Sequence, residues 1–254
     1  MISKAGIKNN LKKNLKKILF TGIIVFFSLY SEAQITSGKI VFERKTNLKK
    51  RLGDNPRMKN FITEENKYRI EDFEMYFNDS TCVFLPLPDE EPSEGMMKYF
   101  TTHNTVYQNI VKREKYIVMD LWGNPAYIKD TMDYRKWKVT ESKRMICGYN
   151  CRKAIWEMND STRIYAWFSV DIVPSIGPEG FEGLPGAILG LATEDGSVIY
   201  FAKEVKAMEP PAGILKYEDK GKDVYTEEAL KAILMERMSQ WMKPKDLEAM
   251  FSWL

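Results

Sequence analysis

Between residues 177 and 186 the chain reads Gly-Pro-Glu-Gly-Phe-Glu-Gly-Leu-Pro-Gly, and six of these ten residues are glycine or proline. Pro185 has the φ required at the second position of a β-turn, and Gly186 can take the positive φ that a type II turn needs at the third. Residues 187–192 contain no polar side chain, which is typical of a strand covered on both faces. We therefore expect a structural turn followed by a buried strand, in which Gly190 marks a bulge or a close backbone approach. The functional alternative is that this turn forms the rigid rim of a binding site.

The remainder of the chain is mostly β in pattern. Asn78-Asp79-Ser80 separates two strand-like runs, and Asn159-Asp160-Ser161 separates two more, so each predicts a hairpin. Asp195-Gly196 between apolar runs predicts a third. Further strands are expected in runs that are rich in apolar and aromatic residues: residues 38–43, 115–122 and 137–140.

The period changes near the C-terminus. Thr226 can cap a helix in which large apolar side chains share one face: Leu230, Ile233, Leu234, Met238 and Trp241. Pro244 can begin a last short helix. The fold class expected is mainly β (α+β), with a strongly curved antiparallel sheet or incomplete barrel and a C-terminal helix packed on it.

Three segments in order resemble the GLPGLI family of exported bacterial proteins. The matching positions are Gly148, Tyr149, Cys151 and Ala154 in the first segment, Trp167 in the second, and Gly177, Pro178, Gly183, Leu184, Pro185 and Gly186 in the third. The sequence departs from the family name at Ala187, where the run stays apolar. The resemblance implies an exported, sheet-rich protein, and it implies no catalytic residue.

Residues 1–33 have the pattern of a signal peptide. Six lysines precede an apolar stretch from Ile18 to Phe27, and Ser31 and Ala33 are the small residues that a signal peptidase reads. The apolar stretch is shorter than the ~20 residues of a membrane span, so we expect cleavage near Ala33 and no retained transmembrane helix. A retained anchor is the alternative. The mature protein would be periplasmic or secreted.

Residues 34–254 are expected to form a single domain. Without residues 1–33, which hold six lysines and one glutamate, the formal net charge changes from +3 to −2. A nucleic-acid partner normally needs a concentrated basic surface, and none remains in this part of the sequence.

Catalytic and metal-binding patterns are scarce. The single histidine, His103, lies in a polar stretch without an accompanying nucleophile motif, so we expect no catalytic residue. Met235, Met238 and Met242 could hold Cu(I), but methionines at helical spacing usually fill a core, so no metal or other cofactor is expected. Glu182, directly before the turn, is the carboxylate that most needs inspection in a structure.

The three cysteines, Cys82, Cys147 and Cys151, leave a disulfide possible after export. In one straight strand Cys147 and Cys151 would lie ~13 Å apart, whereas a disulfide needs Cα atoms closer than ~7 Å. They can pair only across a sharp bend; otherwise Cys82 is the cross-strand candidate. Unpaired buried thiols are the alternative.

Three function classes follow from these observations. The first is a non-enzymatic exported binding or carrier protein for an apolar small molecule, lipid or peptide, with a cleft near the turn at residues 184–187. The second is a cell-envelope interaction or assembly module with an outer-membrane or other envelope protein as partner. The third is a hydrolase whose site has no recognised motif. An aromatic-lined cavity would favour the first, an exposed apolar patch the second, and a perturbed carboxylate in a cleft the third.

Overall fold

The computed structural model describes residues 34–52, 60–88, 100–159, 162–218, 223–240 and 243–251. The chain divides into two units, Met1–Gln34 and Ile35–Leu254. The expected signal peptide lies outside the described residues, as does Trp241 of the expected C-terminal helix face.

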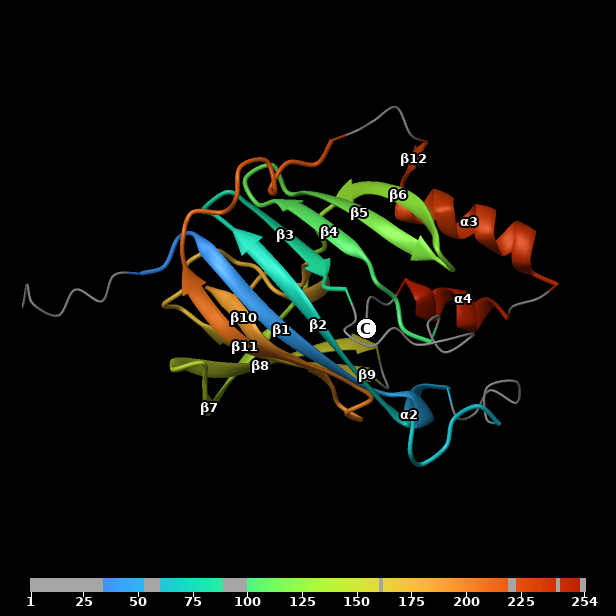
Figure 1. Cartoon of the computed structure of the whole chain (residues 1–254), viewed down its shortest axis with the longest axis horizontal. Helices are drawn as coiled ribbons and strands as arrows, with labels where there is room; N and C mark the ends of the chain where they lie inside the picture. The colour runs from blue at the N-terminus through green and yellow to red at the C-terminus, as the bar shows by residue number, and fades with distance from the viewer. Residues whose placement is uncertain are drawn as a thin grey trace, which may run out of the picture. The chain divides into compact units, whose positions relative to one another are not determined.

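The second unit is mainly β, as expected. Its strands are β1 (Gly38–Asn47), β2 (Tyr68–Phe77), β3 (Thr81–Pro86), β4 (Thr105–Asn109), β5 (Glu114–Leu121), β6 (Asn124–Thr131), β7 (Lys138–Ile146), β8 (Tyr149–Asn159), β9 (Thr162–Ser169), β10 (Ala187–Thr193), β11 (Val198–Ala207) and β12 (Val224–Tyr225). They form one open sheet in the order β12-β6-β5-β4-β3-β2-β1-β11-β10-β9-β8-β7 (Figure 1). Every neighbouring pair is antiparallel except β12 with β6.

The helical elements are α2 (Leu48–Leu52), the 3-10 turn η2 (Pro178–Gly180), α3 (Glu227–Met238) and α4 (Pro244–Met250). The predicted cap of α3 is confirmed, because Thr226 Oγ1 accepts a hydrogen bond from the Ala229 amide at 3.2 Å. Leu230 and Leu234 on the expected apolar face are buried, and α3 packs on β6. In the part of the chain that the structure describes, no helix is long and apolar enough to cross a membrane.

The three predicted hairpins are present as the pairs β2–β3, β8–β9 and β10–β11. A further hairpin was not predicted. The sequence suggested that a strand ends at Gly123-Asn124-Pro125, but Asn124 and Pro125 begin β6 and pair with β5. Trp122 and Gly123 both have positive φ, as a type I′ hairpin turn requires. The proline is tolerated because it is exposed at the start of a strand near the edge of the sheet.

The first strand is longer than expected, and its extension carries polar side chains. The sequence predicted an end at Glu43, but β1 continues to Asn47, and residues 48–52 form the short helix α2. Arg44 and Thr46 are buried on the same face as Ile40 and Phe42, which we call the inner face of the sheet. Buried and exposed side chains therefore alternate along the whole of β1, but the buried ones change from apolar to polar after Phe42. A prediction based on hydrophobicity cannot detect the polar half of the strand.

The β9–β10 loop (residues 170–186) covers this inner face. Its apolar side chains Ile172, Ile176, Phe181 and Leu184 are buried in the same core as the inner residues of the strands. Within the loop, η2 packs on β3 and β4, and the Gly180 carbonyl accepts a hydrogen bond from Gln108 Nε2 of β4 at 3.0 Å. Most of the glycine-rich motif is therefore buried against the core of the domain, and only Gly183 and Pro185 of residues 177–186 are exposed.

Candidate functional site

The turn that ends the β9–β10 loop differs from the one predicted. Gly186 has a positive φ of 136°, as expected, but the type II assignment is wrong. The Gly186 amide donates to the Leu184 carbonyl at 2.8 Å, which closes a three-residue turn around Pro185. The amide of Ala187 is unavailable for a type II turn because it donates to the Ile172 carbonyl at 2.9 Å. The close packing of the loop against itself therefore selects the tighter turn.

The other motif residues do not converge on one site. Gly148 completes a type I′ turn with Cys147 between β7 and β8. Cys151 and Ala154 are both buried, whereas Trp167 lies on the face of the sheet opposite the inner face, where its ring is 5.7 Å from that of Phe201.

Gly190 is the residue that lets those two rings meet. A Cβ at this position would lie 2.6 Å from Phe201 Cε1, and the register of β10 with β9 shifts between Ile188 and Gly190. Both expectations for Gly190, a bulge and a close approach, are therefore confirmed.

The three cysteines are free. The I′ turn places Cys147 outside the strand that holds Cys151, and the Cys147 thiol donates to the Ala202 carbonyl at 3.1 Å. The Cys82 thiol donates to Gln108 Oε1 at 3.2 Å, and burial raises its pKa to about 12. The disulfide that the sequence left possible is not formed in this structure.

A row of polar side chains crosses the inner face where β2, β1 and β11 lie side by side. Arg44 of β1 stands directly opposite Glu71 of β2 and Tyr200 of β11, and all three are buried. Arg44 donates to Glu71 Oε2 through Nε at 3.1 Å and Nη2 at 2.6 Å, and to the Tyr200 hydroxyl through Nη1 at 3.2 Å. Its guanidinium also lies 4.6 Å from the centre of the Phe73 ring. Together Arg44, Glu71 and Tyr200 form a buried polar layer that lies next to the aromatic core.

Glu71 connects this row to the segment before β4. Its Oε1 accepts hydrogen bonds from Arg69 Nε at 2.6 Å and Thr101 Oγ1 at 2.7 Å, and it lies 2.7 Å from His103 Nε2. Burial alone would raise the pKa of Glu71, but the hydrogen bond to His103 and the charge of Arg44 hold it well below its usual range. Glu71 is therefore an ionised carboxylate whose acceptor sites are fully used.

Glu179 of the β9–β10 loop completes the layer from the other side. Tyr200 donates its hydroxyl to Glu179 Oε1 at 2.7 Å, and Arg44 Nη1 lies 3.7 Å from the same oxygen. The second oxygen, Oε2, is buried without a hydrogen-bond partner among the described residues. Burial raises the pKa of Glu179 to about 7, because Arg44 directs its closest donors to Glu71 and compensates only in part.

The two carboxylates of this polar layer are buried: Glu71 and Glu179 are each 4 % exposed in the described part of the chain. His103, the single histidine, is only partly buried, and its Nε2 lies 2.7 Å from Glu71 Oε1. The described residues also contain no group of three His, Cys, Asp or Glu arranged to hold a metal ion. A perturbed carboxylate, Glu179, is thus present, and in the described structure it is buried.

Glu182, the carboxylate singled out from the sequence, is buried beside a second set of charges. Its Oε1 lies 3.5 Å from Arg113 Nη2, and its carbonyl accepts a hydrogen bond from Trp137 Nε1 at 2.8 Å. Burial raises its pKa, against the opposing charges of Arg113 and Arg135. Glu179, three residues earlier, is the acid that reaches the central layer. One feature of the sequence could have pointed to Glu179: it is a charged residue placed between Pro178 and Gly180 in the glycine-rich motif.

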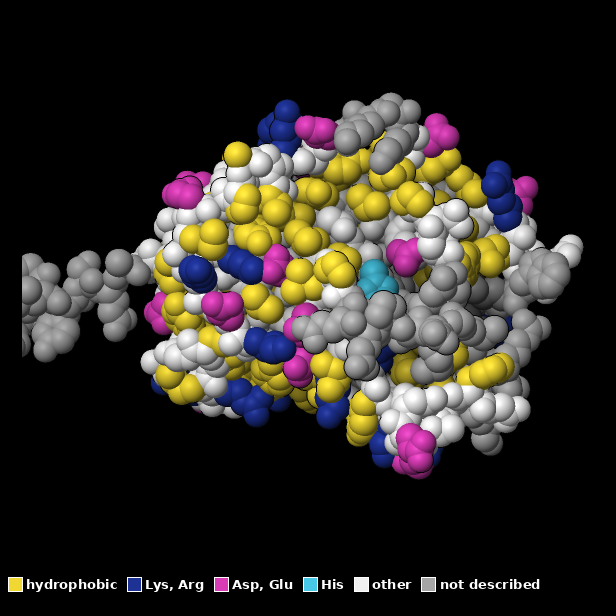
Figure 2. Space-filling model, viewed as in Figure 1, with side chains coloured by type: hydrophobic (Ala, Val, Ile, Leu, Met, Phe, Trp, Pro, Cys, Tyr) yellow, Lys and Arg dark blue, Asp and Glu magenta, His cyan; other side chains and the backbone are white. Residues whose placement is uncertain are grey.

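An open groove lies on the other face of the sheet, which we call the outer face. It has a volume of about 830 Å³ and lies between the turns at the ends of β2 and β4, the outer side of β4 to β6, and the β11–β12 segment (residues 208–218). In Figure 1 that segment runs along the upper margin of the view, past the ends of β3 to β5. Figure 2 shows hydrophobic side chains gathered over strands β3 to β6.

Aromatic side chains form the floor and one wall of the groove. Tyr107 of β4 and Tyr116 of β5 are cross-strand neighbours on the outer face. The Tyr217 ring of the β11–β12 segment stacks on Tyr116 with ring centres 4.4 Å apart and meets Tyr107 edge-on at 5.6 Å. The same register continues across six strands through a row in which each member faces the next: Lys39, Tyr76, Val83, Tyr107, Tyr116 and Lys129.

The groove is not at the place where the sequence predicted a cleft, near the turn at residues 184–187. Leu184 and the four residues from Ala187 to Gly190 are buried in the core, and the groove residues belong to other elements. Sequence reasoning missed the groove because its tyrosines lie on three separate segments. Only the register of β4 with β5 and the return of the β11–β12 segment bring them together.

Comparison with known proteins gives a likeness of fold. No family model matches the sequence, and no curated protein matches it. The structure is similar to that of PNGF-II in space group P21, with a TM-score of 0.52 and 15 % identity over 79 % of this chain and 33 % of that chain. PNGF-II in space group C2 gives a TM-score of 0.50 and 18 % identity over 81 % of this chain and 34 % of that chain.

A crystal structure of an uncharacterised conserved protein from Thermus thermophilus is also similar, with a TM-score of 0.40 and 9 % identity over 82 % of this chain and 99 % of that chain. This chain spans about a third of the length of the PNGF-II chains that it matches. At these identities the likeness to PNGF-II shows that the two share a fold.

Proposed function

We propose that this protein is a non-enzymatic binding or carrier protein, and that the outer-face groove is its ligand site. The observation that carries the proposal is the meeting of Tyr107, Tyr116 and Tyr217 in an open groove of about 830 Å³. Volumes of this order suit small-molecule ligands, and aromatic faces contribute contact area with little loss of conformational entropy. The wall opposite the tyrosines is also apolar, with Pro210, Pro211 and Leu215.

A catalytic role is less well supported by the same geometry. The carboxylates of the polar layer, Glu71 and Glu179, are each 4 % exposed, and a substrate could reach them only if the surrounding side chains moved. The groove needs no such rearrangement.

The proposed place of action is outside the cytoplasm. The support is the lysine-rich start, the apolar stretch and the small residues at Ser31 and Ala33, together with the resemblance to exported GLPGLI proteins. A ligand of this site would then be met in the periplasm or in the medium.

We further propose that the sheet is strongly curved, as an incomplete barrel around the β9–β10 loop. Neighbouring residues of that loop, Glu179 and Gly180, bond to Tyr200 of β11 and Gln108 of β4. These strands are four places apart in the sheet, or ~19 Å if it were flat. Curvature brings both within reach of one short turn and leaves the groove on the convex side.

The binding role is tested with phenylnaphthylamine, an uncharged apolar fluorescent probe, on the folded mature protein. We expect saturable binding that weakens about tenfold in Tyr116→Ala and Tyr107→Ala, since each variant removes one aromatic face. Tyr165→Ala is the matched control, because Tyr165 lies on β9 outside the groove and donates to Glu194. Equal binding by the groove variants and the control would reject the groove as the site.

A further inference from the structure

Two asparagine side chains at the rim of the groove, Asn78 and Asn109, have their acceptor atoms occupied within the rim itself. Asn78 Oδ1 accepts from the amide and the hydroxyl of both Ser80 and Thr81, at 2.8 to 3.1 Å. Asn109 Oδ1 accepts from the Lys112 amide at 2.9 Å. The acceptor atoms of both side chains are therefore used by the turns that shape the rim. Neither amide nitrogen has a hydrogen-bond partner in the part of the chain that the structure describes.

The charged side chains that line the groove include one more lysine than glutamate. Three lysines line it, Lys112, Lys129 and Lys216, against two glutamates, Glu114 and Glu209. Lys129 Nζ lies 3.8 Å from Glu114 Oε1 and 5.0 Å from the centre of the Tyr116 ring, so this pair is largely neutralised on one side of the tyrosines. Lys112 and Lys216 form no ion pair with a described residue.

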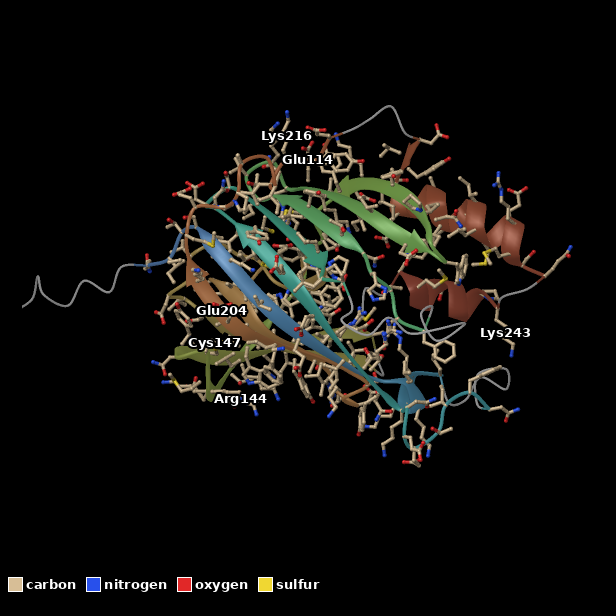
Figure 3. The ribbon with its side chains drawn as sticks, viewed as in Figure 1. Glu114, Arg144, Cys147, Glu204, Lys216 and Lys243 are labelled. Atoms are coloured by element: carbon tan, nitrogen blue, oxygen red, sulfur yellow. The ribbon has the colours of Figure 1, made fainter. Side chains whose placement is uncertain are left out.

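Lys216 stands at the same end of the groove as Glu114. Figure 3 shows both side chains at the upper edge of the molecule, Lys216 from the β11–β12 segment and Glu114 from the start of β5. Since Glu114 is within ion-pair distance of Lys129, Lys216 adds a second positive charge to the lining of the groove. Lys112 of the β4–β5 turn lines the groove as well, so two separate segments each contribute a lysine.

We propose that the groove takes an organic anion, a molecule with a flat or extended apolar body and one acidic group, with the body on the tyrosines and the acid between Lys112 and Lys216. The inference rests on the proposed binding role of the groove and adds the chemical class of the ligand. The apolar body fits Tyr107, Tyr116 and the proline wall, and the acid supplies the acceptor atoms that the Asn78 and Asn109 amides and the lysines lack. Ammonium groups at a partly exposed rim add affinity that falls as salt is raised.

The test uses two probes with the same aromatic body, anilinonaphthalene sulfonate, which is an anion, and phenylnaphthylamine, which is neutral. For the wild-type mature protein we expect the sulfonate to bind at least about tenfold more tightly than the neutral probe. The double variant Lys112→Gln/Lys216→Gln should lose about tenfold in affinity for the sulfonate and stay within about twofold for the neutral probe. Lys138→Gln/Lys206→Gln removes the same charge at exposed lysines that do not line the groove, and should leave both affinities unchanged.

The outcomes separate the two proposals. Equal affinity for the two probes, or a sulfonate affinity that the groove variant leaves unchanged, overturns the anion inference while the binding role stands. Failure of both probes to bind wild-type protein overturns both. Circular dichroism of each variant, compared with that of the wild type, confirms that the affinities refer to folded protein.

Discussion

At the scale of single residues, Glu179 combines three unfavourable features. It is a buried acid, its backbone φ is 53°, and its carboxyl oxygen Oε2 has no hydrogen-bond partner among the described residues. Left-handed backbone and an unsatisfied buried oxygen both cost stability, so its place depends on the surrounding contacts. Those contacts are the Tyr200 hydroxyl and the nearby charge of Arg44.

Glu179 should make the free energy of unfolding fall as pH rises toward neutrality. Its pKa is about 7 in the folded protein and 4.5 when unperturbed, so folding favours the protonated form. The stability is fully present below pH 4.5 and is lost as pH rises through 7. Urea unfolding between these pH values should show a loss of about 3 kcal/mol in wild type relative to Glu179→Gln, in which the group cannot ionise.

The pKa of Glu71 is shifted in the opposite direction, so Glu71 does not interfere with that measurement. Its pKa is lowered in the folded state, so its contribution is present above pH 4.5 and is lost only as pH falls below that value. The two carboxylates therefore act in separate pH ranges. A difference between wild type and Glu179→Gln that stays constant from pH 4.5 to 8 would show that Glu179 has an ordinary pKa.

At the scale of elements, the junction of the β9–β10 loop with β10 is the most tightly determined point. Gly186 has a φ of 136°, and a Cβ there would lie 2.0 Å from the Ser169 carbonyl oxygen. Gly123 in the β5–β6 turn also has a positive φ, 87°, but a Cβ there would meet nothing within 4 Å. A side chain at Gly123 would therefore cause backbone strain alone, whereas a side chain at Gly186 would cause strain and a steric clash.

Alanine at these two positions should therefore have unequal effects. Gly123→Ala is expected to lower the free energy of unfolding by about 1 kcal/mol, the cost of a left-handed residue with a side chain. Gly186→Ala is expected to lose more than about 3 kcal/mol, because the backbone of Ser169 has to move as well. Thermal unfolding of both variants measures the difference. Similar losses would mean that the β9–β10 loop can shift away from β9 without penalty.

Much of the element level was predictable. The hairpins at residues 78–80 and 195–196 were marked by turn residues between alternating or apolar runs, and Thr226 marked the start of α3. β4 was missed because it is short and polar: Gln108 on one face bonds to the β9–β10 loop, and Tyr107 on the other contacts Tyr217 of the β11–β12 segment. Its partners lie far away along the chain, so no local pattern announces it.

At the scale of the whole molecule, we predict that the N-terminal segment is removed by cleavage near Ala33. Protein recovered from the native envelope or medium should begin at or within a few residues of Gln34, since Ser31 and Ala33 provide the small residues of a cleavage site. N-terminal sequencing measures this directly. An intact Met1 on protein found in the cytoplasm would contradict both the signal peptide and the proposed place of action.

The mainly β class, most of the hairpins and the need for glycine at residues 186 and 190 can be predicted from the amino-acid sequence. Those features depend on side-chain alternation, turn geometry and backbone freedom, which are local properties of the chain. The positions of the candidate sites follow from the three-dimensional arrangement of the chain. The layer of Arg44, Glu71, Glu179 and Tyr200 and the tyrosines of the groove each join segments that are distant in sequence. Cross-strand register and the paths of two long loops bring them together, and neither is encoded in any single stretch of residues.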